Sequence, residues 1–519
     1  MTTKTSPERS GAVLVAAGIL LSRLAGLVRL RTFAYYFGLQ SDAADAFNAA
    51  FRIPNLLQNL FGEGALSASF IPVYASLLGK DDRLEADRVA GAIGALLALT
   101  TAIVVALGIA AAPLLTDVIA PGFSGEKREL TVTLVRVLFP GAGLLVLSAW
   151  CLGVLNSHRR FLLSYAAPVI WNAAMIATLV WLGRSATLSY LAVALAWGSV
   201  AGSALQCAVQ LPAVFAVARS LRFAIDRESA HVRQVARNFG PVFIGRGVVQ
   251  ISAFIDTVIA SLLPTGAVTG IANAQLLYTL PVSLFGMSVA AAELPAMARE
   301  AGADNPARDT VRARLHTGLR RIAFFVIPSA IAFLAFGDVI AGAILQTGRF
   351  RNEDAIYVWG ILAGSAIGLL ASTLGRLYAS TSYALHDTRT PLRFAIVRIV
   401  VATVLGYVLA VRAPAWINIE PLWGAAGLTV AASVAAWIEL LLLRRAIEAR
   451  IGAARMPPAY LATLWLLAIA AAAVAWGVRV ALPPVHPAVA AAAILGPYGV
   501  LFLGGTWLAG VPFVRRLRG

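Results

Sequence analysis

Apolar stretches of about 20 residues, the length that a helix needs to cross a bilayer, alternate with short polar connectors from Ala12 to Val514. We therefore expect an all-α polytopic membrane protein with no sizeable soluble domain. The pattern predicts about fourteen transmembrane helices, at residues 12–38, 46–78, 90–119, 132–156, 163–183, 189–217, 239–263, 270–297, 322–346, 355–382, 392–411, 421–446, 459–480 and 487–513.

Composition and charge agree with this pattern. Hydrophobic residues make up 59% of the 519 residues and charged residues 13%, against about 25% charged in soluble domains. The net charge of +17 would suggest nucleic acid in a soluble protein, but its distribution gives a different explanation. With a cytoplasmic N-terminus, the inner connectors and tails hold 27 of the 42 Lys and Arg residues, and the outer connectors hold seven. We expect both termini in the cytoplasm and no nucleic-acid partner.

No pattern in the chain indicates covalent chemistry. Cys151 and Cys207 both fall in apolar segments, and the five histidines form no cluster. The nucleophile-elbow, zinc-protease and phosphate-loop patterns are absent from the sequence. A membrane glycosyltransferase is the main alternative from another class, but its acidic metal ligands are missing, since the acids are scattered. We expect no enzyme activity, no metal and no cofactor.

Eight basic residues remain outside these connectors and tails, all within predicted helices, where each costs about 2.5–3.5 kcal/mol if it faces lipid. They are Arg23, Arg29, Arg31, Arg52, Arg136, Arg246, Arg376 and Arg398. We expect several to line a cavity, with Asp45 and Glu63 as counter-charges. Arginine stays protonated and binds phosphate oxygens with two parallel hydrogen bonds, so the cluster favours a diphosphate-like anion. Snorkelling to an interface is the alternative for arginines near helix ends.

Proline and glycine interrupt two of the predicted helices in a similar way. Pro54, Gly62 and Pro72 lie in 46–78, and Pro281 and Pro295 lie in 270–297. Broken helices of this kind line water-filled cavities in many transporters, although glycine is also common in ordinary helix packing.

Several motifs resemble those of the MurJ (MviN) lipid II flippase family, and they span most of the chain. Near the N-terminus they comprise Ser22, Arg23, Gly26 and Arg29, then Asp45 and Phe47, then Arg52, Pro54 and Asn55, then Phe61, Glu63, Gly64, Ser67, Phe70 and Pro72. Further matches are Gly153, Asn156, Ser157, Phe161, Pro168, Asn172, Gln250, Ser252, Asp256, Thr257, Gln346, Gly348, Phe350, Tyr383, Asp387, Thr390 and Pro391.

The resemblance implies two helix bundles around a central cavity, at 1–217 and 218–455, with two extra C-terminal helices at 456–519. It implies a transporter that moves undecaprenyl-diphosphate-linked peptidoglycan precursor across the bacterial cytoplasmic membrane. The partners would be this lipid-linked precursor and membrane lipids, and we expect a monomer. By motif position, the substrate-binding residues would be Arg23, Arg29, Asp45, Arg52 and Glu63.

The chain also departs from the family pattern. Gln58 and Leu276 stand where the family often has arginine, and we hypothesise that Arg246 restores the missing cavity charge. Asp256 matches a sodium-binding acid of some relatives whose partners are absent here, so Arg398 is a candidate to replace the ion. A flippase for another polyprenyl-diphosphate-linked glycan, or a non-transporting scaffold, remains the alternative.

Overall fold

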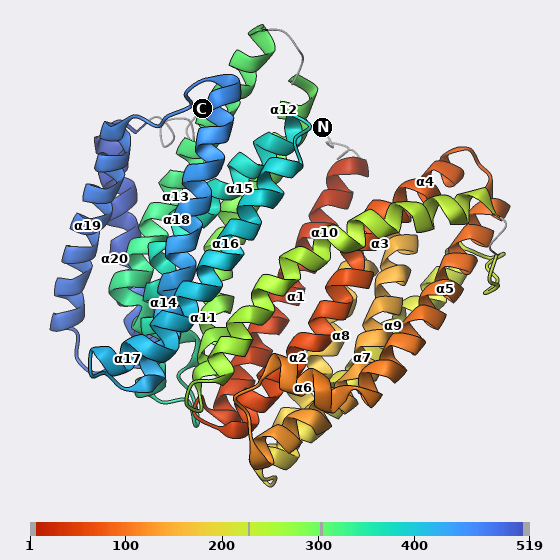
Figure 1. The fold of residues 1–519 in the computed structure, drawn as a ribbon, viewed down its shortest axis with the longest axis horizontal. Helices are drawn as coiled ribbons and strands as arrows, with labels where there is room; N and C mark the ends of the chain where they lie inside the picture. The colour runs from red at the N-terminus through yellow and green to blue at the C-terminus, as the bar shows by residue number, and fades with distance from the viewer. Residues whose placement is uncertain (1–6, 227–228, 301–304, 512–519) are drawn as a thin grey trace, which may run out of the picture. The chain divides into compact units, whose positions relative to one another are not determined.

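The computed structural model describes residues 7–226, 229–300 and 305–511, and every regular element in these ranges is helical (Figure 1). The chain forms two compact units. The first comprises Met1–Ser261 and Thr347–Arg349, and the second comprises Leu262–Gln346 and Phe350–Gly519. The predicted all-α fold class is confirmed.

Ten helices build the first unit, within the described residues. They are α1 (Pro7–Phe37), α2 (Asp42–Phe61), α3 (Glu63–Ser69), α4 (Ile71–Gly79), α5 (Arg83–Ala110), α6 (Ala112–Ile119), α7 (Gly125–Ser157), α8 (Phe161–Leu182), α9 (Leu188–Val217) and α10 (Ala230–Ser261). Helix α7 is the most central, because it packs against α2, α5 and α9, while α1 packs along α8. Its fully buried Trp150 donates from Nε1 to the carbonyl oxygen of Ala90 on α5, at 3.1 Å.

The predicted helix 46–78 is divided into α2, α3 and α4. At Gly62 the backbone turns to φ −85° and ψ −142°, and a Cβ atom there would lie 2.1 Å from the carbonyl oxygen of Gln58. Pro72 falls in the first turn of α4, where its missing N–H group leaves no hydrogen bond unmade. The expected interruption of this helix is therefore present, and glycine is required at its first break.

The second unit contains the remaining helices. They are α11 (Ala267–Pro281), the π-helical segment η1 (Val282–Met287), α12 (Ser288–Glu300), α13 (Asn305–Leu345), α14 (Asn352–Ile367), α15 (Leu369–Ala384), α16 (Arg389–Tyr407), the π-helical segment η2 (Val408–Arg412), α17 (Ala413–Trp416), the 3-10 turn η3 (Pro421–Trp423), α18 (Gly424–Ile451), α19 (Pro458–Ala481) and α20 (Pro487–Leu508). The C-terminal helices α19 and α20 pack against each other and along α13. The predicted helix 270–297 is interrupted directly after Pro281, by η1.

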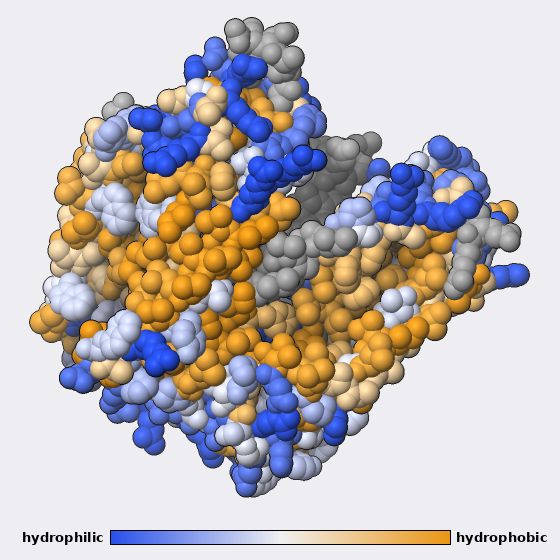
Figure 2. Space-filling model, in the orientation of Figure 1, coloured by the Kyte–Doolittle hydropathy of each residue, from blue (hydrophilic) through white to orange (hydrophobic). Residues whose placement is uncertain are grey.

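Within the described residues, ten helices are long and apolar enough to cross a membrane, or eleven if α14 and α15, bent by 44°, form one broken span. Hydrophobic residues cover the flanks of the helices and hydrophilic residues gather at their ends (Figure 2). The protein is thus a multi-pass membrane protein. All fourteen predicted segments coincide with helices, but the count of fourteen spans stays a prediction. The expected boundaries between bundles at residues 217 and 455 also stay predictions. Helix α10, which follows residue 217, packs against α2 and α3 of the first unit.

Candidate functional site

Arg29 lies on α1, where this helix packs against α8. Its Nε donates to Oδ1 of Asn172 at 2.9 Å, and Asn172 is 4% exposed. The Nδ2 group of Asn172 donates in turn to the carbonyl oxygen of Pro168 at 2.9 Å, which points the amide oxygen at the arginine. Among the described residues, the other polar side-chain contact of Arg29 is weak, because Nη1 lies 3.9 Å from the sulfur of Met175. Asn172 therefore orients Arg29 and leaves its two terminal nitrogens largely available.

Two aromatic rings flank the same guanidinium group. The Cζ atom of Arg29 lies 5.6 Å from the ring centre of Phe51 and 5.2 Å from that of Trp171. These two rings stack on each other at 5.8 Å, and Nε1 of Trp171 donates to the carbonyl oxygen of Ser199 at 3.2 Å. A cation over an aromatic face gains roughly 0.5–2 kcal/mol, more when it is shielded from water. The rings offset part of the cost of burial without neutralising the charge.

Asp45 lies in the first turn of α2 and is 1% exposed. Nζ of Lys127, on α7, lies 2.9 Å from Oδ2 of Asp45 and 3.0 Å from Oδ1 of Asp42. The same Nζ atom lies 4.4 Å from the ring centre of Phe123. The sequence predicts buried arginines as partners of Asp45, and Lys127 falls in a predicted outer connector. The structure shows Lys127 bridging α7 to the start of α2.

Two further arginines have acidic neighbours. Arg52, half-buried on α2, interacts electrostatically with Asp256 on α10, within the first unit. In the second unit, Nη1 of Arg398 on α16 lies 3.2 Å from Oε2 of Glu439 on α18. Asp256 and Arg398 thus each have an interaction within their own unit. Their direct pairing stays a hypothesis.

The other predicted site residues are placed as follows. Arg23 is exposed on α1. The side chains of Glu63 and Arg246 lie outside the described part of the chain, so their roles stay predictions. Among the described residues, no group of three or more His, Cys, Asp or Glu side chains could hold a metal ion.

A family model described as lipid II flippase MurJ matches residues 33–488. The chain belongs to the MurJ lipid II flippase family. The lipid II flippase MurJ of Burkholderia cenocepacia is 34% identical over 439 residues, which cover 83% of this chain and 82% of the relative. The probable lipid II flippase MurJ of Rhizobium meliloti is 32% identical over 439 residues, which cover 83% and 78%. The family predicted from the motifs is confirmed.

Solved structures show the same fold. A lipid II flippase MurJ in an inward closed conformation matches with a TM-score of 0.77 at 23% identity, covering 98% of this chain and all of that one. An inward-facing MATE family multidrug resistance transporter of the MOP superfamily matches with a TM-score of 0.64 at 18% identity, covering 84% and 98%. The matched MurJ range begins after Arg23 and Arg29 and includes Asp45, Arg52 and Asp256.

Proposed function

We propose that this chain is a lipid II flippase of the bacterial cytoplasmic membrane. It moves the undecaprenyl-diphosphate-linked peptidoglycan precursor from the inner to the outer leaflet by alternating access. Family membership carries this proposal, because the MurJ model matches most of the chain and the curated relatives are lipid II flippases. The fold supports it, because other structures of this fold belong to membrane transporters.

Arg29 is the described residue best suited to contact the diphosphate. Its Nε is occupied by Asn172, while Nη1 has a weak contact with sulfur, so the terminal nitrogens can form charge-assisted hydrogen bonds to phosphate. Arg23 is exposed on the same helix. Together with Arg52, Asp45, Glu63 and Arg246, these residues form the proposed substrate-binding set.

The proposal includes no covalent step and no cofactor. Binding and release by a helical transporter need a change in the exposure of the site, not a bond-making residue. The proposal takes the protein to be a monomer. Both of its termini lie in the cytoplasm, as the bias of Lys and Arg among the connectors predicts. Labelling of single cysteines placed in successive connectors of the intact membrane protein tests this orientation. Cysteines that are labelled from the opposite side of the membrane to the one predicted for their connectors would contradict it.

Complementation of a conditional flippase mutant tests the activity, with lipid II in the outer leaflet measured directly. Wild type restores growth and outer-leaflet lipid II, whereas Arg29→Ala restores neither at equal expression. Arg445→Gln, which removes an exposed arginine elsewhere, should behave as wild type. Failure of wild type to restore lipid II, together with rescue of another polysaccharide pathway, would replace this proposal with a flippase for a different lipid-linked glycan.

The compensating role of Arg246 has its own test. If Arg246 supplies the cavity charge that Gln58 and Leu276 lack, Arg246→Ala abolishes complementation and Arg246→Lys retains part of it. Normal growth of the alanine variant at normal expression would remove Arg246 from the substrate-binding set.

The ion-coupling role of Asp256 and Arg398 is a separate proposal. If Arg398 stands in for sodium, transport by wild type is independent of sodium, and Arg398→Ala introduces a sodium requirement. Glu439→Gln removes the carboxylate that contacts Arg398 and serves as a control for loss of that ion pair alone. Identical sodium responses in wild type and Arg398→Ala would refute the coupling role.

A further inference from the structure

A cavity of about 640 Å³ lies where three long apolar helices of the first unit end. Helix α5 begins at Arg83, α7 ends at Ser157 and α9 ends at Val217, and each is long and apolar enough to span the membrane. The cavity is therefore at the membrane surface. Its charged and titratable lining consists of Arg83, Asp87, His158, Arg159, Arg160 and Arg219.

The lining has an excess of positive charge. Asp87 is its one carboxylate, and Oδ2 of Asp87 already accepts from the backbone N–H of Ser220 at 2.9 Å. Within the described residues, no carboxylate lies within 4.0 Å of Arg159, Arg160 or Arg219. Burial lowers the pKa of His158, which favours the neutral form of the ring. Nε of Arg83 lies 3.2 Å from Oδ1 of exposed Asp81. Among the described residues, the lining arginines without a carboxylate partner are therefore Arg159, Arg160 and Arg219, from two connectors.

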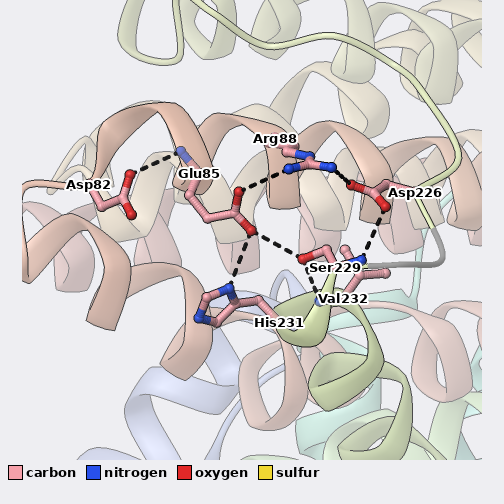
Figure 3. Close-up of polar contacts among 7 residues, drawn as sticks. All are labelled: Asp82, Glu85, Arg88, Asp226, Ser229, His231 and Val232. Carbon is pink, nitrogen blue, oxygen red and sulfur yellow. Dashed lines mark hydrogen bonds and ion pairs between the residues drawn. The ribbon is translucent and has the colours of Figure 1, made fainter.

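Arg88, on the next turn of α5, is compensated differently. Arg88 lies 2.6 Å from Oδ2 of Asp226 and 3.6 Å from Oε2 of Glu85 (Figure 3). Nδ1 of His231 lies 3.3 Å from the other oxygen of Glu85. This acid-rich cluster holds the start of α10 and the preceding connector against α5. The positive charge of the cavity is therefore not a general property of this end of the unit.

Arg159 is also held in an unusual backbone conformation. Its φ is +60°, in the left-handed region, and it follows the end of α7 at a position where glycine is the usual residue. The turn is closed by hydrogen bonds from the N–H groups of Arg159 and Arg160 to the carbonyl oxygens of Asn156 and Leu155, at 3.0 and 2.9 Å. An arginine here carries a conformational cost that glycine would avoid, which points to a use for its side chain.

We propose that this cavity binds the phosphate group of a membrane lipid. Guanidinium groups form paired hydrogen bonds with phosphate oxygens, and the volume lies in the range of sites that enclose a small ligand. Basic pockets between membrane helices are suited to anionic headgroups. The phosphate can belong to an anionic phospholipid or to a polyprenyl diphosphate, and both present the same chemistry at this depth. The site is separate from Arg29, and its binding can be measured whether or not the chain transports lipid II.

Native mass spectrometry of the detergent-purified full chain can count bound lipids in titrations with phosphatidylglycerol, phosphatidylcholine and undecaprenyl diphosphate. The test variant is Arg159→Asn/Arg160→Gln, because asparagine tolerates the left-handed backbone. Each arginine near a charged lipid surface contributes about fivefold in affinity. The double variant should therefore bind phosphatidylglycerol about 25-fold more weakly than wild type. Arg393→Gln/Arg445→Gln removes two exposed arginines outside the cavity and should leave binding unchanged.

The outcomes separate the two lipid sources. Selective loss of phosphatidylglycerol binding identifies a phospholipid, and selective loss of undecaprenyl diphosphate binding identifies the carrier lipid. Equal losses in the control variant would overturn the proposal. So would a test variant that binds both phosphatidylglycerol and undecaprenyl diphosphate as tightly as wild type does. Arg219→Gln, on another connector, is an independent variant with an expected loss of about fivefold. Its failure to weaken binding would also overturn the proposal if the first variant did not fold.

Discussion

Replacement of Lys127 by methionine should destabilise the first unit strongly. Lys127 is 12% exposed and lies 2.9 Å from Asp45, which is 1% exposed, whereas the second acid, Asp42, is 62% exposed. Removing one member of a buried ion pair costs about 3–5 kcal/mol, and an exposed pair contributes at most about 1 kcal/mol. We expect a loss of about 3 kcal/mol, because the lysine retains some contact with water. This corresponds to a fall in Tm of roughly 6–12 °C.

Thermal unfolding of the purified protein in one detergent measures this loss. The double variant Asp45→Asn/Lys127→Met removes both charges. Its loss of unfolding free energy should be about 2 kcal/mol smaller than the sum of the losses in the two single variants. Arg128→Met is the matched control, because Arg128 is the next residue and pairs with exposed Asp117, so no change in Tm is expected. Additive single effects, or an equal fall in Tm for the control, would refute a stabilising Asp45–Lys127 pair. A stable double variant that fails in complementation would assign Asp45 a role in transport as well.

Two further predictions concern the backbone break and the pH dependence of stability. Gly62→Ala should lower Tm, because the new Cβ atom would clash with the carbonyl oxygen of Gln58. Gly79→Ala should leave Tm unchanged, because a Cβ atom at that position has no neighbour within 4 Å. Hydrogen bonds from Thr390, and then the charge of Arg450, lower the pKa of Asp387. The stability that Asp387 contributes is therefore complete above its unfolded pKa of about 3.9 and is lost as the pH falls through its lower folded value. Tm measured from pH 7 to pH 3 should be lower for Asp387→Asn at neutral pH and converge with wild type at the acid end, and a constant difference would contradict this.

Hydropathy predicts where the helices of this chain lie, but it misses their polar first turns. Helix α5 begins at Arg83 instead of residue 90, and α7 at Gly125 instead of residue 132. These turns lie outside the apolar stretch, so a pattern set by the bilayer does not include them. Capping does signal the earlier start of α5, since Oδ1 of Asp82 accepts from the N–H of Glu85 at 3.2 Å.

The partners of the site residues were harder to predict than the residues themselves. A charge at membrane depth is conspicuous in the sequence, so Arg29 and Arg52 could be selected directly. Asn172 matches a family motif, but its contact with Arg29 joins positions 143 apart in the chain. No local periodicity relates such positions. Lys127 is hard to select from the sequence for a different reason, because a basic residue beside a helix end is usually a topology signal.

Three partly buried cations of the first unit, Lys127, Arg52 and Arg29, are compensated in two physically different ways. Lys127 faces two carboxylates, and Arg52 interacts with Asp256, so each has a formal negative charge nearby. Arg29 is oriented by the amide of Asn172 and flanked by aromatic faces, which are neutral. A carboxylate partner would have to be displaced before an anion could bind, whereas neutral partners leave the positive charge available. This difference, more than burial alone, favours Arg29 over Lys127 and Arg52 as the residue that meets the diphosphate.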